Sequence, residues 1–136
     1  REGAADETGI DRSRMARVEL GSANPTPEEV LLLADTYDAP QLLNYYCSMC
    51  CPIGRQNVKP CAVQEFDRVM MQALAALQGA DKVSAAIISI ARDGRVDPGE
   101  DVQMGEILAY MKNVATAAMQ LWIKKNLKGE ACNDKK

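Results

Sequence analysis

The stretch that decides the fold is residues 8–21, which read Thr8-Gly9-Ile10-Asp11-Arg12-Ser13-Arg14-Met15-Ala16-Arg17-Val18-Glu19-Leu20-Gly21. Gly9 predicts a tight turn at the end of one short helix, because glycine takes a positive φ at little steric cost. Asp11 can accept hydrogen bonds from the free amides that open a second short helix. Met15 and Val18 lie three residues apart and predict the inner face of that helix. The stretch therefore predicts two short helices joined by a tight turn.

The outer side of the second helix is predicted to carry Arg12, Ser13, Arg14 and Arg17. Guanidinium groups and hydroxyls donate hydrogen bonds to phosphates and to base edges, so this face suits contact with double-stranded DNA. The alternative interpretation is a solvated arginine face on a small helical domain.

The same residues carry a family resemblance. Gly9–Ser13, Arg17–Gly21 and Asn24-Pro25-Thr26, followed by a helix with Val30, Leu31, Leu33 and Ala34, resemble the lambda-repressor/Cro (XRE) family of helix-turn-helix transcriptional regulators over roughly residues 3 to 46. The resemblance implies that Ala4–Thr8 is the positioning helix and Arg12–Leu20 the recognition helix, with Arg12, Ser13, Arg14 and Arg17 at base edges. Family members begin with a further helix, for which there is no room before Gly3, so we expect the first helix to be missing.

A second resemblance lies just after this region. Tyr46-Cys47 with Cys51-Pro52-Ile53-Gly54 resembles a motif of Firmicute regulators of this type, in which a helical C-terminal region follows. That resemblance implies a helical part downstream.

Composition limits the possible functions. Of 136 residues, 47% are apolar and 26% are charged, which is typical of a folded chain. Aromatic residues make up only 4%, while Ala, Leu and Met are plentiful, which favours a helical core. The formal net charge of −3 argues against coating nucleic acid by bulk charge, but it leaves room for a reader whose positive charge is confined to one helix.

The chain contains no histidine, which removes the usual general base and the commonest metal ligand. Catalytic Ser-His and Cys-His arrangements are therefore excluded, and no motif indicates an enzyme or a cofactor. We find no signal peptide and no apolar run near the roughly twenty residues of a membrane helix. We therefore expect a cytoplasmic protein without a membrane partner.

The cysteines Cys47, Cys50, Cys51 and Cys61 could supply thiolates to a metal ion or an iron–sulfur cluster. No second well-spaced pair supports this, so no metal site is predicted. Buried or surface thiols at a helix end are the plainer interpretation. A reducing cytosol argues against a structural disulfide framework.

The second half of the chain reads as two long helical stretches. The first carries an apolar stripe from Val63 to about Arg92 and is either one helix or two that meet at Gly79. The second runs from about Pro98 to Leu127, with its stripe at Met104, Ile107, Met111, Val114, Ala118 and Leu121, widened by Leu108, Ala115 and Trp122. Joined by a short turn, the two stretches predict an antiparallel hairpin that needs a further apolar partner.

The sequence therefore predicts an all-α protein, with a repressor-like helix-turn-helix bundle followed by a long antiparallel helical hairpin. We expect a DNA-binding domain at 1–46, a Cys/Pro linker without regular structure at 47–62, a dimerisation hairpin at 63–128 and a flexible tail at 129–136. The predicted function is sequence-specific binding to double-stranded DNA as a transcriptional regulator, as a homodimer assembled through the hairpin. Two alternatives remain, a protein-interaction module that does not bind DNA and a cysteine-based metal or redox sensor.

Overall fold

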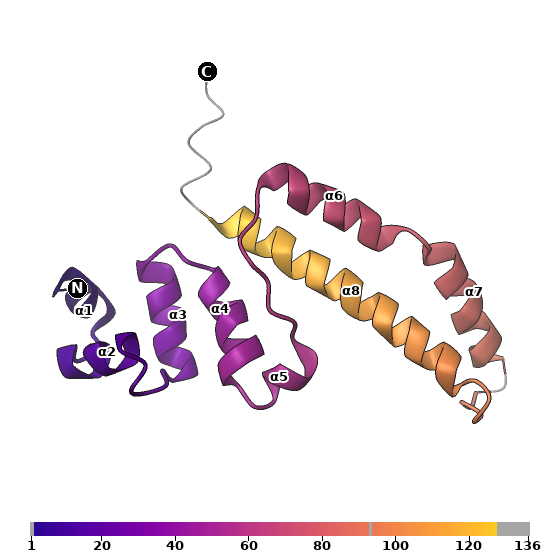
Figure 1. The fold of residues 1–136 in the computed structure, drawn as a ribbon, viewed down its shortest axis with the longest axis horizontal. Coiled ribbons are helices and arrows are strands. Elements are labelled where there is room, and N and C mark those ends of the chain that lie inside the picture. The colour runs from indigo at the N-terminus through magenta and orange to yellow at the C-terminus, as the bar shows by residue number, and fades with distance from the viewer. Residues whose placement is uncertain (1, 93, 128–136) are drawn as a thin grey trace, which may run out of the picture. The chain divides into compact units, whose positions relative to one another are not determined.

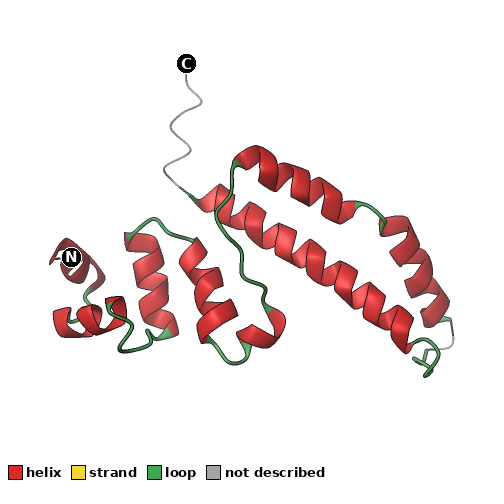
Figure 2. Cartoon of the chain, viewed as in Figure 1, coloured by secondary structure: helices red, strands yellow, loops and turns green. Residues whose placement is uncertain are grey.

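The structure is a computed structural model that describes residues 2–92 and 94–127. Within those residues every regular element is a helix, which confirms the all-α prediction, and Figures 1 and 2 show their order. The elements are α1 (Glu2–Thr8), α2 (Arg12–Glu19), α3 (Pro27–Thr36), α4 (Gln41–Tyr45), the π-helix η1 (Tyr46–Cys50), α5 (Gly54–Asn57), α6 (Phe66–Leu77), α7 (Ala80–Ala91) and α8 (Asp101–Asn126). The predicted tail at 129–136 lies outside the described residues.

The chain divides into two compact units. Of the described residues, the first unit holds 2–63 together with 122–127, and the second lies within Gln64–Leu121. Each unit is described by itself below.

The core of the first unit forms where α1 and α2 meet α3. Ala5 of α1, Met15 of α2, and Val30, Leu33 and Ala34 of α3 are buried. Helix α3 begins with Thr26 as the N-cap and Pro27 in the first helical position, which are the positions that these residue types favour. This core holds α2 by its inner side and leaves its outer side exposed.

The connector after α4 corrects one prediction. Pro52, Gly54 and Pro60 suggested a segment without regular structure, but the chain continues from α4 into η1 and then forms α5. The physical reason lies in Asn44, whose buried amide nitrogen donates to the carbonyl of Lys59 at 3.0 Å and whose oxygen accepts from the amide of Cys61 at 2.7 Å. These two bonds fold the connector back against α4, and tertiary contacts of this kind leave no local sequence signal.

The second unit contains α6, α7 and most of α8. The helical stretch after the connector is two helices, which end and begin around Gly79, one of the two alternatives that the sequence left open. Helix α6 begins at Phe66 and α8 at Asp101, each three residues later than predicted. Before α8 the amide of Glu100 donates to the carbonyl of Asp97 at 2.8 Å, which closes a turn instead of the first helical turn.

The stripe of α8 that faces its neighbours differs from the predicted one. Met111 and Ala118 are exposed, whereas Ile107 and Ala117 are buried and Tyr110, Val114 and Leu121 are half-buried. The inner line therefore runs through Ile107, Tyr110, Val114, Ala117 and Leu121. The hydroxyl of Tyr110 donates to the carbonyl of Leu77 at 3.1 Å, which fixes this side of α8 toward the end of α6.

Candidate nucleic-acid interface

The turn between α1 and α2 is built from local hydrogen bonds. Gly9 has a φ of +69°, and its amide donates to the carbonyl of Ala5 at 3.0 Å. The carboxylate of Asp11 accepts from the amides of Ser13 at 3.0 Å and of Arg14 at 3.1 Å. These hydrogen bonds lower the pKa of the Asp11 carboxyl, and the bond from the Arg14 amide has the largest effect. The start of α2 is therefore fixed by its own cap.

The outer side of α2 carries three of the four residues that the sequence singled out. Arg12, Ser13 and Arg17 are exposed, whereas Met15 of the same helix is buried. Three side chains that can donate hydrogen bonds to phosphates or bases thus share the solvent-facing part of one short helix.

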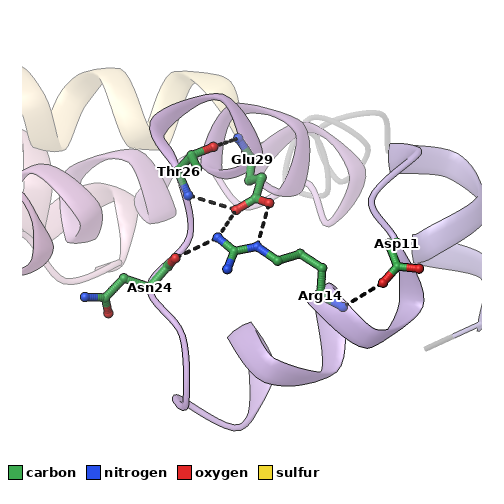
Figure 3. Close-up of polar contacts among 5 residues, drawn as sticks. All are labelled: Asp11, Arg14, Asn24, Thr26 and Glu29. Carbon is green, nitrogen blue, oxygen red and sulfur yellow. Dashed lines mark hydrogen bonds and ion pairs between the residues drawn. The ribbon is translucent and has the colours of Figure 1, made fainter.

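Arg14 lies differently, as Figure 3 shows. Its Nε donates to Oε1 of Glu29 at 2.9 Å, and its Nη2 donates to Oε2 of Glu29 at 2.9 Å and to the carbonyl of Asn24 at 2.9 Å. The side chains of Arg14 and Glu29 are only 26% and 18% exposed. The sequence predicted a DNA contact for Arg14, but in this conformation its guanidinium ties α2 to the start of α3.

Glu29 has a second task in the same cluster. Its carboxylate accepts from the amide of Thr26 at 2.8 Å, and its own amide donates to the hydroxyl of Thr26 at 3.2 Å, which completes a capping box. Sequence reasoning missed this reciprocal pair of hydrogen bonds. The spacing of a threonine and a glutamate three residues apart was the available signal.

The hydrogen bonds from Arg14 and from Thr26 both lower the pKa of Glu29. The bond from the Arg14 side chain has the larger effect, and together with the bond from the Thr26 backbone it lowers this pKa to about 2, from an ordinary value of 4.5. Glu29 therefore stays ionised over the whole neutral and mildly acidic range.

This pKa predicts how the stability of the first unit depends on pH. The native pKa lies below the unfolded one, so the Glu29 contribution is fully present above pH 4.5 and is lost as the pH falls from 4.5 toward 2. We expect Glu29→Gln to flatten the fall in the free energy of unfolding across this window, measured by urea denaturation at several pH values. Glu28→Gln, which changes an exposed carboxylate in the same helical turn, should leave the slope unchanged. Equal slopes for all three proteins would contradict the assignment.

Arg12 interacts only weakly with the nearby Asp6. Arg12 lies 3.7 Å from the carboxylate of Asp6, and both side chains are more than half exposed, at 65% and 73%. Exposed pairs of this kind contribute little and exchange readily with other partners. Moving the Arg12 side chain from Asp6 to a DNA phosphate would therefore cost little free energy.

An apolar cavity of about 240 Å³ lies in the first unit. Its walls come from α2, α3, α4 and η1, and the lining residues are Val18, Pro25, Val30, Leu33, Leu42, Tyr45, Tyr46 and Cys50. Burial is the main cause that raises the pKa of Tyr46. Chemically, this cavity offers contacts to a small apolar molecule and no charged group to bind it.

The cysteines do not assemble a metal site in the described part of the chain. Across residues 2–92 and 94–127, no three His, Cys, Asp or Glu side chains gather where they could hold a metal ion. Cys47, Cys50 and Cys51 are free thiols, and burial raises the pKa of the Cys61 thiol. Cys132 lies outside the described residues.

Comparisons of this chain with protein-family models, with curated proteins and with solved structures gave no match. Any functional assignment therefore depends on the geometry described above and on the resemblance in the sequence.

Proposed function

We propose that this chain binds double-stranded DNA in a sequence-specific way as a transcriptional regulator. In this proposal α1, the Gly9 turn and α2 form the helix-turn-helix of a repressor-like bundle, and α6 to α8 form a helical hairpin. The observation that carries the proposal is the exposed set of Arg12, Ser13 and Arg17 on a short helix whose start is capped and whose inner side is buried. A reader of the major groove needs such a helix, held rigidly by its neighbours.

The residues of α2 divide into two roles. Arg12, Ser13 and Arg17 would contact phosphates and base edges, since their side chains reach solvent. Arg14 would act as a positioning residue, because its bidentate pair with Glu29 fixes the angle between α2 and α3. The carboxylate of Glu29 also occupies the amide end of α3, which leaves that end poorly suited to a phosphate.

The proposed partner of the chain, besides DNA, is a second copy bound through the hairpin. A two-fold dimer reads two half-sites roughly 34 Å apart, and pairing multiplies the affinity of each weakly binding half. That multiplication matters here because the net charge of −3 gives little unspecific attraction to DNA.

Selection of bound duplexes from a random pool tests the proposal. We expect an enriched sequence, and we expect affinity for it to fall steeply as the salt concentration rises. A control pool carried through the same rounds without protein removes sequences enriched by amplification. Absence of any enriched sequence, or equal affinity for enriched and random duplexes, would contradict sequence-specific binding.

A second candidate function is a protein-interaction module whose helix-turn-helix no longer binds DNA. Two observations favour it, the commitment of Arg14 to Glu29 and the proximity of Asp6 to Arg12, because each reduces the positive charge that α2 presents. This candidate predicts no affinity for any duplex even at low salt, so the same titration separates the two functions.

A further inference from the structure

The second unit has an apolar side that the described structure leaves uncovered. We call it the apolar face and define it as Phe66, Met70, Leu74 and Leu77 of α6 with Leu108, Met111, Ala115 and Ala118 of α8. All eight are exposed, and the six large ones are 45% to 59% exposed. In contrast, the buried apolar side chains in the described part of this unit are Val69, Ile90, Ile107 and Ala117.

The two rows of this face lie on the same side of the unit. Each residue of an α-helix is rotated by about 100° from the one before it. On α6 the exposed row therefore lies about 100° around the helix axis from the buried Val69. On α8 the exposed row lies about 100° around the axis from the buried line through Ile107 and Ala117. The rotation has the same sense in both helices. Because α6 and α8 run in opposite directions side by side (Figure 1), an equal rotation in both turns the two rows toward one common side.

The opposite side of the unit carries fewer large apolar side chains. The same construction with the reverse rotation gives Glu106, Asn113 and Gln120 on α8 and Arg68 on α6, together with the exposed Val102 and Ala109 of α8 and Ala75 of α6. Six half-exposed large side chains amount to roughly 500 Å² on one side, which is at the upper end of what a monomer exposes in one patch. Most of the large exposed apolar side chains of α6 and α8 therefore gather on one side, which is the side best suited to burial against a partner.

We propose that this face binds the same face of a second copy, with α8 antiparallel to the partner's α8 and α6 antiparallel to the partner's α6. The pairing would complete a four-helix bundle with one apolar core. This pairing specifies the interface and the orientation of the dimer proposed above. It is independent of whether the chain binds DNA.

Charge and side-chain size favour this antiparallel register. Helix α8 has Asp101 in its first turn and Lys124 and Lys125 in its last turn. Antiparallel pairing places the acidic start of each α8 beside the basic end of its partner, whereas parallel pairing would set like charges together. Near the middle, Ala115 and Ala118 are small enough to let the two helices approach closely.

A membrane is the other surface that could cover apolar helices. The sequence predicted no apolar run of membrane length, but the stretch Phe66–Ala91 is long and apolar enough to cross a membrane by length and composition. An 18-residue window within it has a mean hydropathy of 1.3, and 6% of that window is buried. The stretch is, however, interrupted at Gly79 and carries Asp81 and Lys82 in its second half, where a membrane span would have to bury both charges. The apolar face also includes α8, which lies outside that stretch. These observations favour a second copy.

Sedimentation equilibrium of the chain tests the occupant of the face. We expect a dimer for the wild type. For Met111→Glu and for Leu74→Glu we expect the dimer dissociation constant to be at least 100-fold larger, with the helical content measured by circular dichroism unchanged. Asn113→Glu, on the polar side of α8, should leave the dissociation constant unchanged. A wild-type monomer, or a dimer that survives both apolar-face variants, would overturn the proposal.

Two single cysteine variants test the register. Ala115 lies near the middle of α8, so antiparallel pairing brings it close to its own copy, while Leu108 lies seven residues away and is carried far from its copy. We expect mild oxidation to give more covalent dimer than the wild type for Ala115→Cys and no increase for Leu108→Cys. An equal increase for both would show parallel pairing and would refute the antiparallel arrangement, as would an increase for neither.

Co-sedimentation with phosphatidylcholine vesicles gives the membrane outcome. We expect the wild type to stay in the supernatant, and vesicle binding that Met111→Glu abolishes would overturn the pairing proposal in favour of a lipid surface. None of these results depends on DNA. If the chain is a monomer but still enriches one DNA sequence, the pairing is refuted and the proposed DNA-binding function stands. If the chain is a dimer without affinity for DNA, the pairing stands and the proposed function is refuted.

Discussion

Replacing Arg12 and Arg17 together by alanine is expected to weaken binding to the selected duplex by roughly 100-fold, since each lost base or phosphate contact costs on the order of 1–3 kcal/mol. Both side chains are exposed, so their removal leaves the core around Met15 intact. The free energy of unfolding should therefore stay unchanged while the dissociation constant rises, measured by fluorescence anisotropy at a fixed salt concentration.

The matched control removes the same charge elsewhere. Arg55 and Arg68 are exposed cations on α5 and α6, and replacing both by alanine changes the net charge by the same two units. We expect this control to weaken binding only slightly. An equal loss in both double variants would show that bulk charge, and not the face of α2, attracts DNA.

Replacing Gly54 by alanine is expected to destabilise the first unit by roughly 2–3 kcal/mol, because the added carbon overpacks a close contact. A Cβ at this position would collide with the backbone carbonyl of Cys47, and a backbone atom cannot move aside as a flexible side chain can. Gly54 comes close to Cys47 where the chain turns after η1, and at this turn the amide of Arg55 donates to the carbonyl of Cys51 at 2.9 Å. Urea denaturation followed by circular dichroism measures the loss.

Gly3→Ala provides the control for this substitution. Gly3 lies in α1 of the same unit, and a Cβ there would meet no atom within 4 Å. Alanine should stabilise this helix by up to about 1 kcal/mol, since it favours helix more than glycine does. A Gly54→Ala protein as stable as the wild type would show that Gly54 of α5 does not lie against the Cys47 backbone of η1.

The parts of the fold that depend on neighbouring residues were predictable from the sequence. Asp11, Thr26 and Pro27 mark helix starts by local chemistry, and the structure places caps there. Gly79 likewise marked a possible break, and α6 and α7 meet at it. Local signals of this kind need no knowledge of the rest of the chain.

The parts that depend on distant partners were not predictable. Arg14 has the same residue type and helix as Arg12 and Arg17, but Glu29, fifteen residues away, holds its guanidinium. In α8 the apolar residues cover so wide an arc that two stripes fit the pattern, and these share Ile107, Val114 and Leu121 but differ at the positions between them. The bond from Tyr110 to Leu77 marks which stripe turns inward, and it joins residues 33 positions apart.

The salt dependence of DNA affinity tests the central claim most directly, which is that the exposed arginines of α2 bind DNA while Arg14 holds the helix in place. The measurement is the slope of log affinity against log salt concentration on the selected duplex, for the wild type and for the Arg12→Ala/Arg17→Ala protein. The account predicts a slope that becomes shallower by about 1 for each phosphate contact removed and therefore by up to 2. Identical slopes for the two proteins would contradict it.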